Sequence, residues 1–524
     1  MAASTAQPPK LHPWFFPLTL AYLVLPALIF LTTWVRPWLG LPAAAVVLFC
    51  AAWLVRQQPP PVTPGSEPRA GLGRRDLMFV LALAFFWTLL AGAGGFVPQV
   101  SDYLRNNLLY HDLVHLAWPV TYPQPDGHNS YLCYGLGFFL PPALGGRLLG
   151  DAAMPALTFL WMFAGVALFF YWVAAFTRSP KTTLVIFLLF AATNIGLLAL
   201  KRAGIPGWLD YIAVQNTLRE LGLYHSYYDF FTKLQYQPQH GMPGLLGLAL
   251  FYEMLWIKKD PRGAVFVWGA CLFWSPIPCI GLLLIPLAAI RRVPWRAYFS
   301  GINLVGGGSL LAILGVYYQG HLALEDHGFL WNFAPGGKWL IFYLLFVALE
   351  LSPVLVLFLI DRKYRMLGEW RPLFLLAAGL LVLLPLWKFG HSGDQRLQAG
   401  TPALVVAALC AVRCLQSDAF SLKRPLFLLF IGCLLIGAAY PLGRPWWNLI
   451  TNHYDYSYAA TVRTFGFQTL AEMKEPLPPR GDNPALNPGR TAAAAGDTRL
   501  ATGYLNAEQY LGRPDSAAAR WLLR

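Results

Sequence analysis

Long apolar stretches, separated by short polar segments, recur along most of the chain. Each stretch approaches or exceeds the roughly 18 residues that suffice to cross a bilayer as a helix. Because backbone N–H and C=O groups in lipid must be paired within their own segment, we predict that these stretches are membrane helices. The predicted spans are 14–35, 39–55, 77–97, 154–176, 183–200, 241–257, 298–318, 339–360, 372–388, 401–416 and 425–442.

Two apolar stretches depart from this pattern. Residues 264–290 are interrupted by "FWSPIP", whose prolines end or kink a helix, and residues 131–150 are split by Pro141–Pro142. We expect 264–290 to form a hairpin of two half-helices, and 131–150 to lie along the membrane surface without crossing it. A crossing by 131–150 is the alternative, and it would place the basic segment "RSPK" on the outer side.

Lysine and arginine are concentrated in short loops between the apolar stretches. Cytoplasmic loops of membrane proteins carry such an excess. With the two expectations above, "RSPK", "KKDPR", "RRVPWR", "DRKYR", "LKR" and the basic loop before residue 77 all face the cytoplasm. The loops 98–153, 201–240, 319–338 and 388–400 then face outward; they are long, and long loops often carry function.

This threading divides the chain into three parts. Residues 1–76 hold two N-terminal membrane helices and a cytoplasmic loop, and residues 77–442 hold the transmembrane core. We predict an all-α polytopic membrane protein with about 11–13 transmembrane helices in total. Residues 443–524 form an extracytoplasmic tail, in which "KEPLPPRGDNPALNPGRTAAAAGD" is typical of a flexible linker and "YLNAEQYLGRPDSAAARWLL" is expected to form a small helix.

Composition agrees with a membrane environment. The chain is 57% hydrophobic and 12% charged, whereas soluble domains carry roughly 25% charged residues. The net charge of +14 does not indicate nucleic acid, because no basic stripe with interleaved aromatic residues occurs. The seven cysteines form no CxxC pair, which argues against a zinc ribbon or a disulfide framework. We expect a multi-pass protein of the plasma (inner) membrane.

Polar residues gather where the first long outer loop begins, in "SDYLRNNLLYHDLVHLAWP". Asp102 follows the preceding membrane helix, and Asp112 lies further along with His111 and His115 around it. If this segment is helical, the two histidines share one face. Three interpretations remain open: an interfacial helix with solvated polar groups, a zinc site in which "HDLVH" imitates H-E-x-x-H, and a carboxylate site for group transfer.

Further candidates lie in the other outer loops. Asp229 and His240 stand among many Tyr and Trp residues, which stack on sugars but also populate membrane interfaces. The cluster "EDH" of the third loop is either a cation site or an exposed acidic turn. In "KFGHSGDQRLQAG", Arg396 offers a bidentate grip on phosphate and Lys388 adds a point charge, unless both only anchor at lipid headgroups.

These features resemble the GT-C superfamily of membrane glycosyltransferases, in a bacterial branch. In that family a membrane helix leads into a large outer loop that opens with an acidic residue, here Asp102 in "SDYLRNN". The segment "LCYGLGFFLPPALGGRLLG" looks like the juxtamembrane helix of such a loop, and Asp210 or Asp229 would supply the acid of the second loop. The resemblance covers 77–442; two extra helices precede this part, and the adjacent acid pair of some branches is missing.

The resemblance implies transfer of a sugar from a polyprenyl-phosphate donor to an extracytoplasmic lipid, glycan or protein acceptor. Asp102 is then the candidate base, and Asp112 supports it or a divalent ion such as Mg²⁺ or Mn²⁺; a carboxylate that stabilises an oxocarbenium-like transition state is the alternative. Cations would stabilise the donor phosphate as charge builds on it. The residues expected to bind the donor are Arg105, Lys388, Arg396, Asp229 and His240.

Three other functional classes remain open at this stage. A lipid or solute transporter or flippase would tend to show internal repeats and charges near the bilayer midplane; Glu253 and Glu350 lie near inner or central positions, but no repeat is visible. A polysaccharide polymerase or ligase would rely on Arg and His residues of the outer loops instead of Asp102. A zinc hydrolase would use His111 and His115 as metal ligands.

Overall fold

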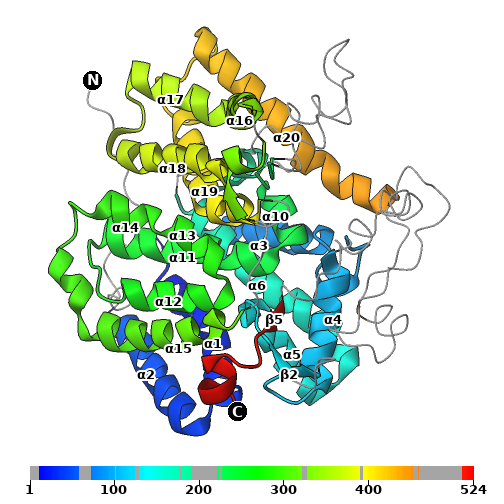
Figure 1. Cartoon of the computed structure of the whole chain (residues 1–524). Coiled ribbons are helices and arrows are strands. Elements are labelled where there is room, and N and C mark those ends of the chain that lie inside the picture. Colours follow the sequence, from blue (N-terminus) through cyan, green and yellow to red (C-terminus); the bar gives the residue numbers. More distant parts are fainter. Residues whose placement is uncertain are drawn as a thin grey trace.

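The structure is a computed structural model, and it describes residues 11–57, 72–100, 102–123, 129–176, 179–190, 221–223, 227–321, 327–334, 336–389, 393–451, 458 and 510–524. The described chain is a bundle of helices (Figure 1). In chain order the α-helices are α1 (Phe15–Thr33), α2 (Pro37–Arg56), α3 (Arg74–Leu90), α4 (Asp102–His115), α5 (Leu140–Leu149), α6 (Met154–Ala174), α7 (Pro180–Leu189), α10 (Phe230–Tyr236), α11 (Pro238–Phe251), α12 (Ala264–Trp274), α13 (Pro276–Leu282), α14 (Leu284–Ala289), α15 (Gly308–Gln319), α16 (Lys338–Glu350), α17 (Ser352–Tyr364), α18 (Arg371–Leu383), α19 (Asp394–Leu415) and α20 (Pro425–Thr451). Among the described residues, the π-helical segments η4 (Tyr252–Ile257) and η6 (Ile302–Gly307) extend α11 and precede α15, and a third, η12 (Ala518–Leu522), lies in the segment 510–524.

Six helical segments are long and apolar enough to cross a membrane, and a seventh is formed if the bent pair α16–α17 counts as one span, within the part of the chain that the structure describes. The all-α polytopic class is therefore confirmed, whereas the expected count of about 11–13 spans is not reached there. Breaks explain much of the difference: α12 and α13 separate at Ser275, and α16 and α17 meet at an angle of 68°. The range 191–200, which holds most of one predicted span, lies outside the described residues.

Both interrupted stretches behave as their prolines predict. Ser275 is extended (φ −167°, ψ 130°), so it ends α12 and starts α13 immediately before Pro276. Within 131–150 the only α-helix is α5, whose ten residues span about 15 Å, half of a bilayer core. The expected half-helices of 264–290 are thus confirmed, and α5 is too short to cross.

Helix α19 is the centre of the bundle. Of its most apolar window, 94% is buried inside the protein, against 33% to 67% for the other five candidate spans. It packs against α7, α11, α13 and α18. Polar side chains at its N-terminal end are therefore held in place by helices from several parts of the chain.

Short strands tie the segment 510–524 to this bundle. Strand β5 (Leu511–Gly512) extends the hairpin of β1 (Thr121–Pro123) and β2 (Asn129–Leu132), pairing Tyr131 with Gly512. A Cβ on Gly512 would lie 2.2 Å from the Tyr131 ring, so only glycine permits this approach. The segment is thus a structural part of the core, which the expectation of a separate tail did not include. A second pair joins β3 (His327–Phe329) to β4 (Trp387–Phe389).

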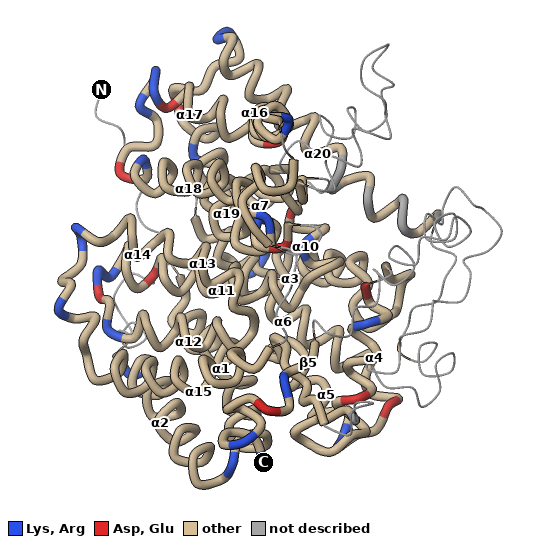
Figure 2. The backbone as a smooth tube through the Cα atoms, in the orientation of Figure 1, with Lys and Arg blue, Asp and Glu red and all other residues tan. Residues whose placement is uncertain are grey.

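Within the described residues, the loops expected to face outward lie at one end of the bundle, and the loops expected to face inward lie at the other. At one end Arg36 donates to the backbone carbonyl of Leu522, and β5 contacts the first outer loop. At the other end Arg292 pairs with Glu369, and the 258–263 loop meets η6. Figure 2 shows Lys and Arg gathered along the edge beside α14 and around α17. This separation agrees with the threading predicted from the basic loops.

Asn303 of η6 fixes one of these inner connections. Its side-chain oxygen accepts from the backbone N–H of Gly263 (3.0 Å) and of Val265 (2.9 Å), and its amide donates to the carbonyl of Pro261 (2.9 Å). The residue is 2% exposed, so these bonds satisfy backbone groups that water does not reach. Asn303 therefore caps the start of α12 and joins it to η6.

Replacing this cap tests the packing. We expect Asn303→Ala to lower the free energy of unfolding by about 2 kcal/mol or more, because it leaves buried donors and an acceptor without partners. The measurement is the thermal unfolding midpoint in detergent. Ser309→Ala is the matched control, since its hydroxyl only bonds back to the Gly306 carbonyl of the same helix. Equal midpoints for the two variants would contradict the role given to Asn303.

Candidate functional site

Asp102 and Arg105 form an ion pair on the first turn of α4. The Asp102 carboxylate lies 3.0 Å from the Arg105 guanidinium, one helical turn away, and the two side chains are 26% and 22% exposed. An acidic residue in the first turn is also favoured by the helix dipole. The pair is therefore held firmly but remains accessible at the edge of the bundle.

A second carboxylate faces this pair from α19. Asp394 is the first residue of α19, and electrostatic interactions link it to Lys233, Arg105, Asp102 and Arg396. The first turns of α4 and α19, far apart in the sequence, thus meet at one place. We call Asp102, Arg105, Lys233, Asp394 and Arg396 the charged cluster.

Lys233 of α10 is the most deeply buried amine of the cluster, at 1% exposure. Its Nζ donates to the backbone carbonyl of Leu397 (2.5 Å) and to Gln237 Oε1 (3.3 Å). Burial lowers the pKa of this amine to about 7; the Asp394 carboxylate partly offsets this effect and Arg396 adds to it. Lys233 can consequently gain or lose a proton near neutral pH.

Asp229 holds the helix that carries Lys233. Its carboxylate accepts from the backbone N–H of Phe231 and of Thr232 (both 2.9 Å) and from the Thr232 hydroxyl (2.7 Å). This is the N-cap arrangement that starts a helix. The structure therefore places Asp229, predicted as a substrate ligand, where it positions Lys233.

Arg396 and Lys388 meet at Gly222. Arg396 donates to the Gly222 carbonyl (2.8 Å) and stacks on Phe346, and its Nη1 is buried without a hydrogen-bond partner among the described residues. The Lys388 amine lies over the Phe333 ring (4.5 Å), and its stem packs on Gly222. The two cations predicted from the fourth outer loop thus lie close together, and Arg396 keeps a free donor.

His240 lies in a hydrogen-bonded line beside the cluster. Its Nε2 is 3.0 Å from the Tyr134 hydroxyl and its Nδ1 is 2.7 Å from Ser275 Oγ. Gln239 also donates to the Tyr134 hydroxyl (3.2 Å). Ser275 reaches His240 because the backbone leaves the helix at this residue. The break in 264–290 therefore places a polar side chain inside the bundle.

Tyr510 brings the segment 510–524 into contact with the same groups. It is 5% exposed, its ring centroid lies 4.5 Å from that of Tyr134, and its hydroxyl is hydrogen-bonded to Arg105 and Tyr134. Pairing of β5 with β2 holds it there, and the Cys133 N–H donates to its carbonyl (2.7 Å). Tyr510 therefore links Arg105 to the His240 line.

The opposite end of α4 holds a separate polar group. Asp112 is fully buried and accepts from the Tyr122 hydroxyl (2.7 Å), while His115 pairs with Asp151 (3.0 Å). The rings of His111 and His115 share one face, with centroids 4.6 Å apart, as the helical spacing predicts. The structure does not bring this group to Asp102.

No set of three or more His, Cys, Asp or Glu side chains suited to a metal ion occurs in the described ranges. At Asp102, the carboxylate oxygen Oδ1 is paired with the Arg105 guanidinium. Asp210, Glu325 and Asp326 lie outside the described residues.

Sequence reasoning placed Asp102, Arg105, Arg396 and His240 in the site region but did not select several of their neighbours. Lys233 stands among aromatic residues in "DFFTKLQYQPQH". A charged residue in such surroundings of a membrane protein indicates a functional site, so Lys233 could have been selected from the sequence. Tyr134 and Tyr510 carry no such signal, because tyrosine is common at membrane interfaces. Asp394 stands in "KFGHSGDQRLQAG", from which only Lys388 and Arg396 were selected.

The chain was compared with family models, curated proteins and solved structures, and none of the three comparisons gave a match.

Proposed function

We propose that the protein transfers a sugar from a polyprenyl-phosphate donor to a hydroxyl-bearing acceptor at the charged cluster. The observation that carries the proposal is the meeting of two carboxylates, Asp102 and Asp394, with three cations at the ends of helices α4, α10 and α19. Such a transfer needs a base for the acceptor hydroxyl and positive charge for the leaving phosphate. Both kinds of group are present within one cluster.

Unsatisfied polar atoms around the cluster support a polar ligand. Arg396 Nη1 is a buried donor without a partner, and the side-chain oxygens of Gln235, Gln239 and Gln398 are buried acceptors without one, in the described part of the protein. A buried polar atom left without a hydrogen bond costs roughly 1–3 kcal/mol. A phosphate on Arg396 and sugar hydroxyls on the glutamines would remove this cost.

The roles in the reaction follow from exposure. Asp102 is accessible at the edge of the bundle, so it is the base that takes the proton from the acceptor hydroxyl. The acceptor oxygen then bonds to the anomeric carbon, and the bond from that carbon to the phosphate oxygen breaks. Arg105, Lys233 and Arg396 stabilise the charge that builds on the departing phosphate.

Asp102→Asn tests the assignment of the base. We expect sugar transfer to fall by about 10²–10⁴-fold while binding of the polyprenyl-phosphate sugar is kept, because Asn cannot take the proton. Transfer is measured in proteoliposomes with a radiolabelled donor, and binding by thermophoresis. Asp418→Asn, in the exposed loop after α19, is the control. Full transfer by the Asp102 variant would refute this role.

The pKa of Lys233 predicts the pH dependence of the reaction. Because the amine must be protonated to stabilise the phosphate, kcat/KM should decline as pH rises through about 7, toward tenfold per unit. A phosphodiester donor does not titrate in this range. In Lys233→Arg the guanidinium stays charged, so the decline should move above pH 9.

The control for the pH experiment is Lys258→Arg, at the other end of the bundle beside Glu253. It should keep the wild-type profile. A wild-type profile that is flat between pH 6 and 9, or one that rises with pH, would contradict the electrostatic role of Lys233.

Tyr510→Phe tests whether the segment 510–524 contributes to the site. The ring still packs on Tyr134, but Arg105 loses a hydroxyl partner, so we expect kcat to fall about tenfold with an unchanged unfolding midpoint. Tyr458→Phe is the control, since it removes only a bond to Asp151 near the far end of α4. Equal turnover of both variants would show that Tyr510 merely packs.

A further inference from the structure

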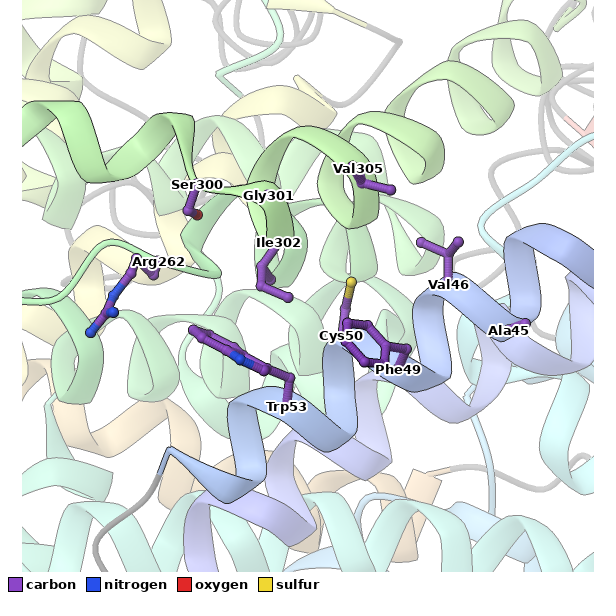
Figure 3. Close-up of a pocket in the computed structure, with 10 residues that line it drawn as sticks. All are labelled: Ala45, Val46, Phe49, Cys50, Trp53, Arg262, Ser300, Gly301, Ile302 and Val305. Atoms are coloured by element: carbon purple, nitrogen blue, oxygen red, sulfur yellow. The ribbon is translucent and has the colours of Figure 1, made fainter.

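A groove of about 650 Å³ runs between α2 and the start of η6, away from the charged cluster. Most of its wall is apolar, from Phe49 and Val46 on α2 to Ile302 and Val305 on η6 (Figure 3). Both helices belong to candidate membrane spans, so an apolar groove between them is suited to a hydrocarbon chain.

The polar groups of the groove gather at one end. Figure 3 shows Arg262 and Ser300 at one side of the opening, and Val46 and Ala45 at the other. The Ser300 hydroxyl is buried without a hydrogen-bond partner among the described residues. Arg262 belongs to the basic loop before α12, where headgroups of the adjacent leaflet are expected. The groove therefore suits an amphipathic molecule with its polar end at Arg262.

One positive and one negative side chain, Arg262 and Asp260, lie beside the groove. Arg262 binds Asp260 through Nε (3.0 Å and 3.1 Å) and Nη2 (2.8 Å), and both side chains keep a third or more of their surface exposed. A headgroup with a phosphate and an ammonium group complements this pair, with phosphate on Arg262 and ammonium on Asp260. A headgroup with only negative charge would meet the Asp260 carboxylate.

We propose that this groove binds phosphatidylethanolamine, with an acyl chain between α2 and η6, the phosphate at Arg262 and Ser300, and the ammonium group at Asp260. This site is independent of the proposed transfer reaction, which takes place at the other end of the bundle.

Glycines give a sharp test of the acyl-chain site. A Cβ at Gly301, which lines the groove, meets no atom within 4 Å, and the backbone there is helical (φ −53°, ψ −37°). Gly301→Leu should therefore fold normally and fill the groove. Gly308 is equally open and helical (φ −60°, ψ −42°) but does not line the groove, so Gly308→Leu is the matched control.

The full-length protein in detergent is titrated with palmitoyl-oleoyl phosphatidylethanolamine or the phosphatidylglycerol analogue, and bound lipid is measured by native mass spectrometry. We expect about tenfold weaker phosphatidylethanolamine binding for Gly301→Leu and for Arg262→Ala, and wild-type binding for Gly308→Leu. Asp260→Asn should reverse the headgroup preference toward phosphatidylglycerol, because Arg262 is then unopposed. Unfolding midpoints verify that each variant is folded.

Two results would overturn the proposal. Wild-type occupancy in a folded Gly301→Leu protein would show that the acyl chain lies elsewhere. Equal affinity of the wild-type protein for the two lipids would show that the groove binds any lipid of the surrounding bilayer without headgroup selectivity.

Discussion

Pairing of ionised groups inside a lipid-solvated fold is the constraint on which the rest of the structure depends. Lys233 and Arg396 are each 1% exposed, and an ion removed from water is costly unless opposite charge and hydrogen bonds surround it. Asp394 interacts with both cations, and Glu350 interacts with Arg396. Well-packed apolar residues can often replace a buried ion pair without loss of stability. The charged cluster is therefore better explained by a functional role than by a contribution to folding alone.

Sequence patterns predicted the parts of this arrangement that depend on local rules. The shared face of His111 and His115 and the break before Pro276 follow from helical spacing and from proline geometry, whereas the ion pair of Asp102 with Arg105 was not predicted. The meeting of Lys233 with Asp394 follows from no local rule, because it depends on how α10 packs beside α19. The capping role of Asp229 could not be predicted either. It depends on the exact residue at which α10 begins, and hydrophobic patterning does not define that residue.

Counting spans from hydropathy treats each apolar stretch as one rod, whereas in the described part of the chain six helical segments, or seven with the bent pair α16–α17, are long and apolar enough to cross a membrane. Here several stretches are broken, and the breaks carry polar groups. Ser275 reaches His240 at the α12–α13 break, and Glu350 is buried at the 68° bend between α16 and α17. Irregular backbone is tolerated at membrane depth where protein surrounds it. In this protein two such irregular points carry polar side chains that interact with site residues: Ser275 with His240, and Glu350 with Arg396.

The pairing of β5 with β2 has a consequence for biogenesis. The ribosome makes α1 to α20 before it reaches residue 510, so the bundle enters the bilayer while Arg105 and Tyr134 still lack the Tyr510 hydroxyl. Contacts between such distant segments form late, since closing a long loop costs entropy before any bond repays it. A nascent chain halted between α20 and β5 would thus contain the whole helix bundle, and the contacts of Arg105 and Tyr134 with Tyr510 would form only once β5 pairs with β2.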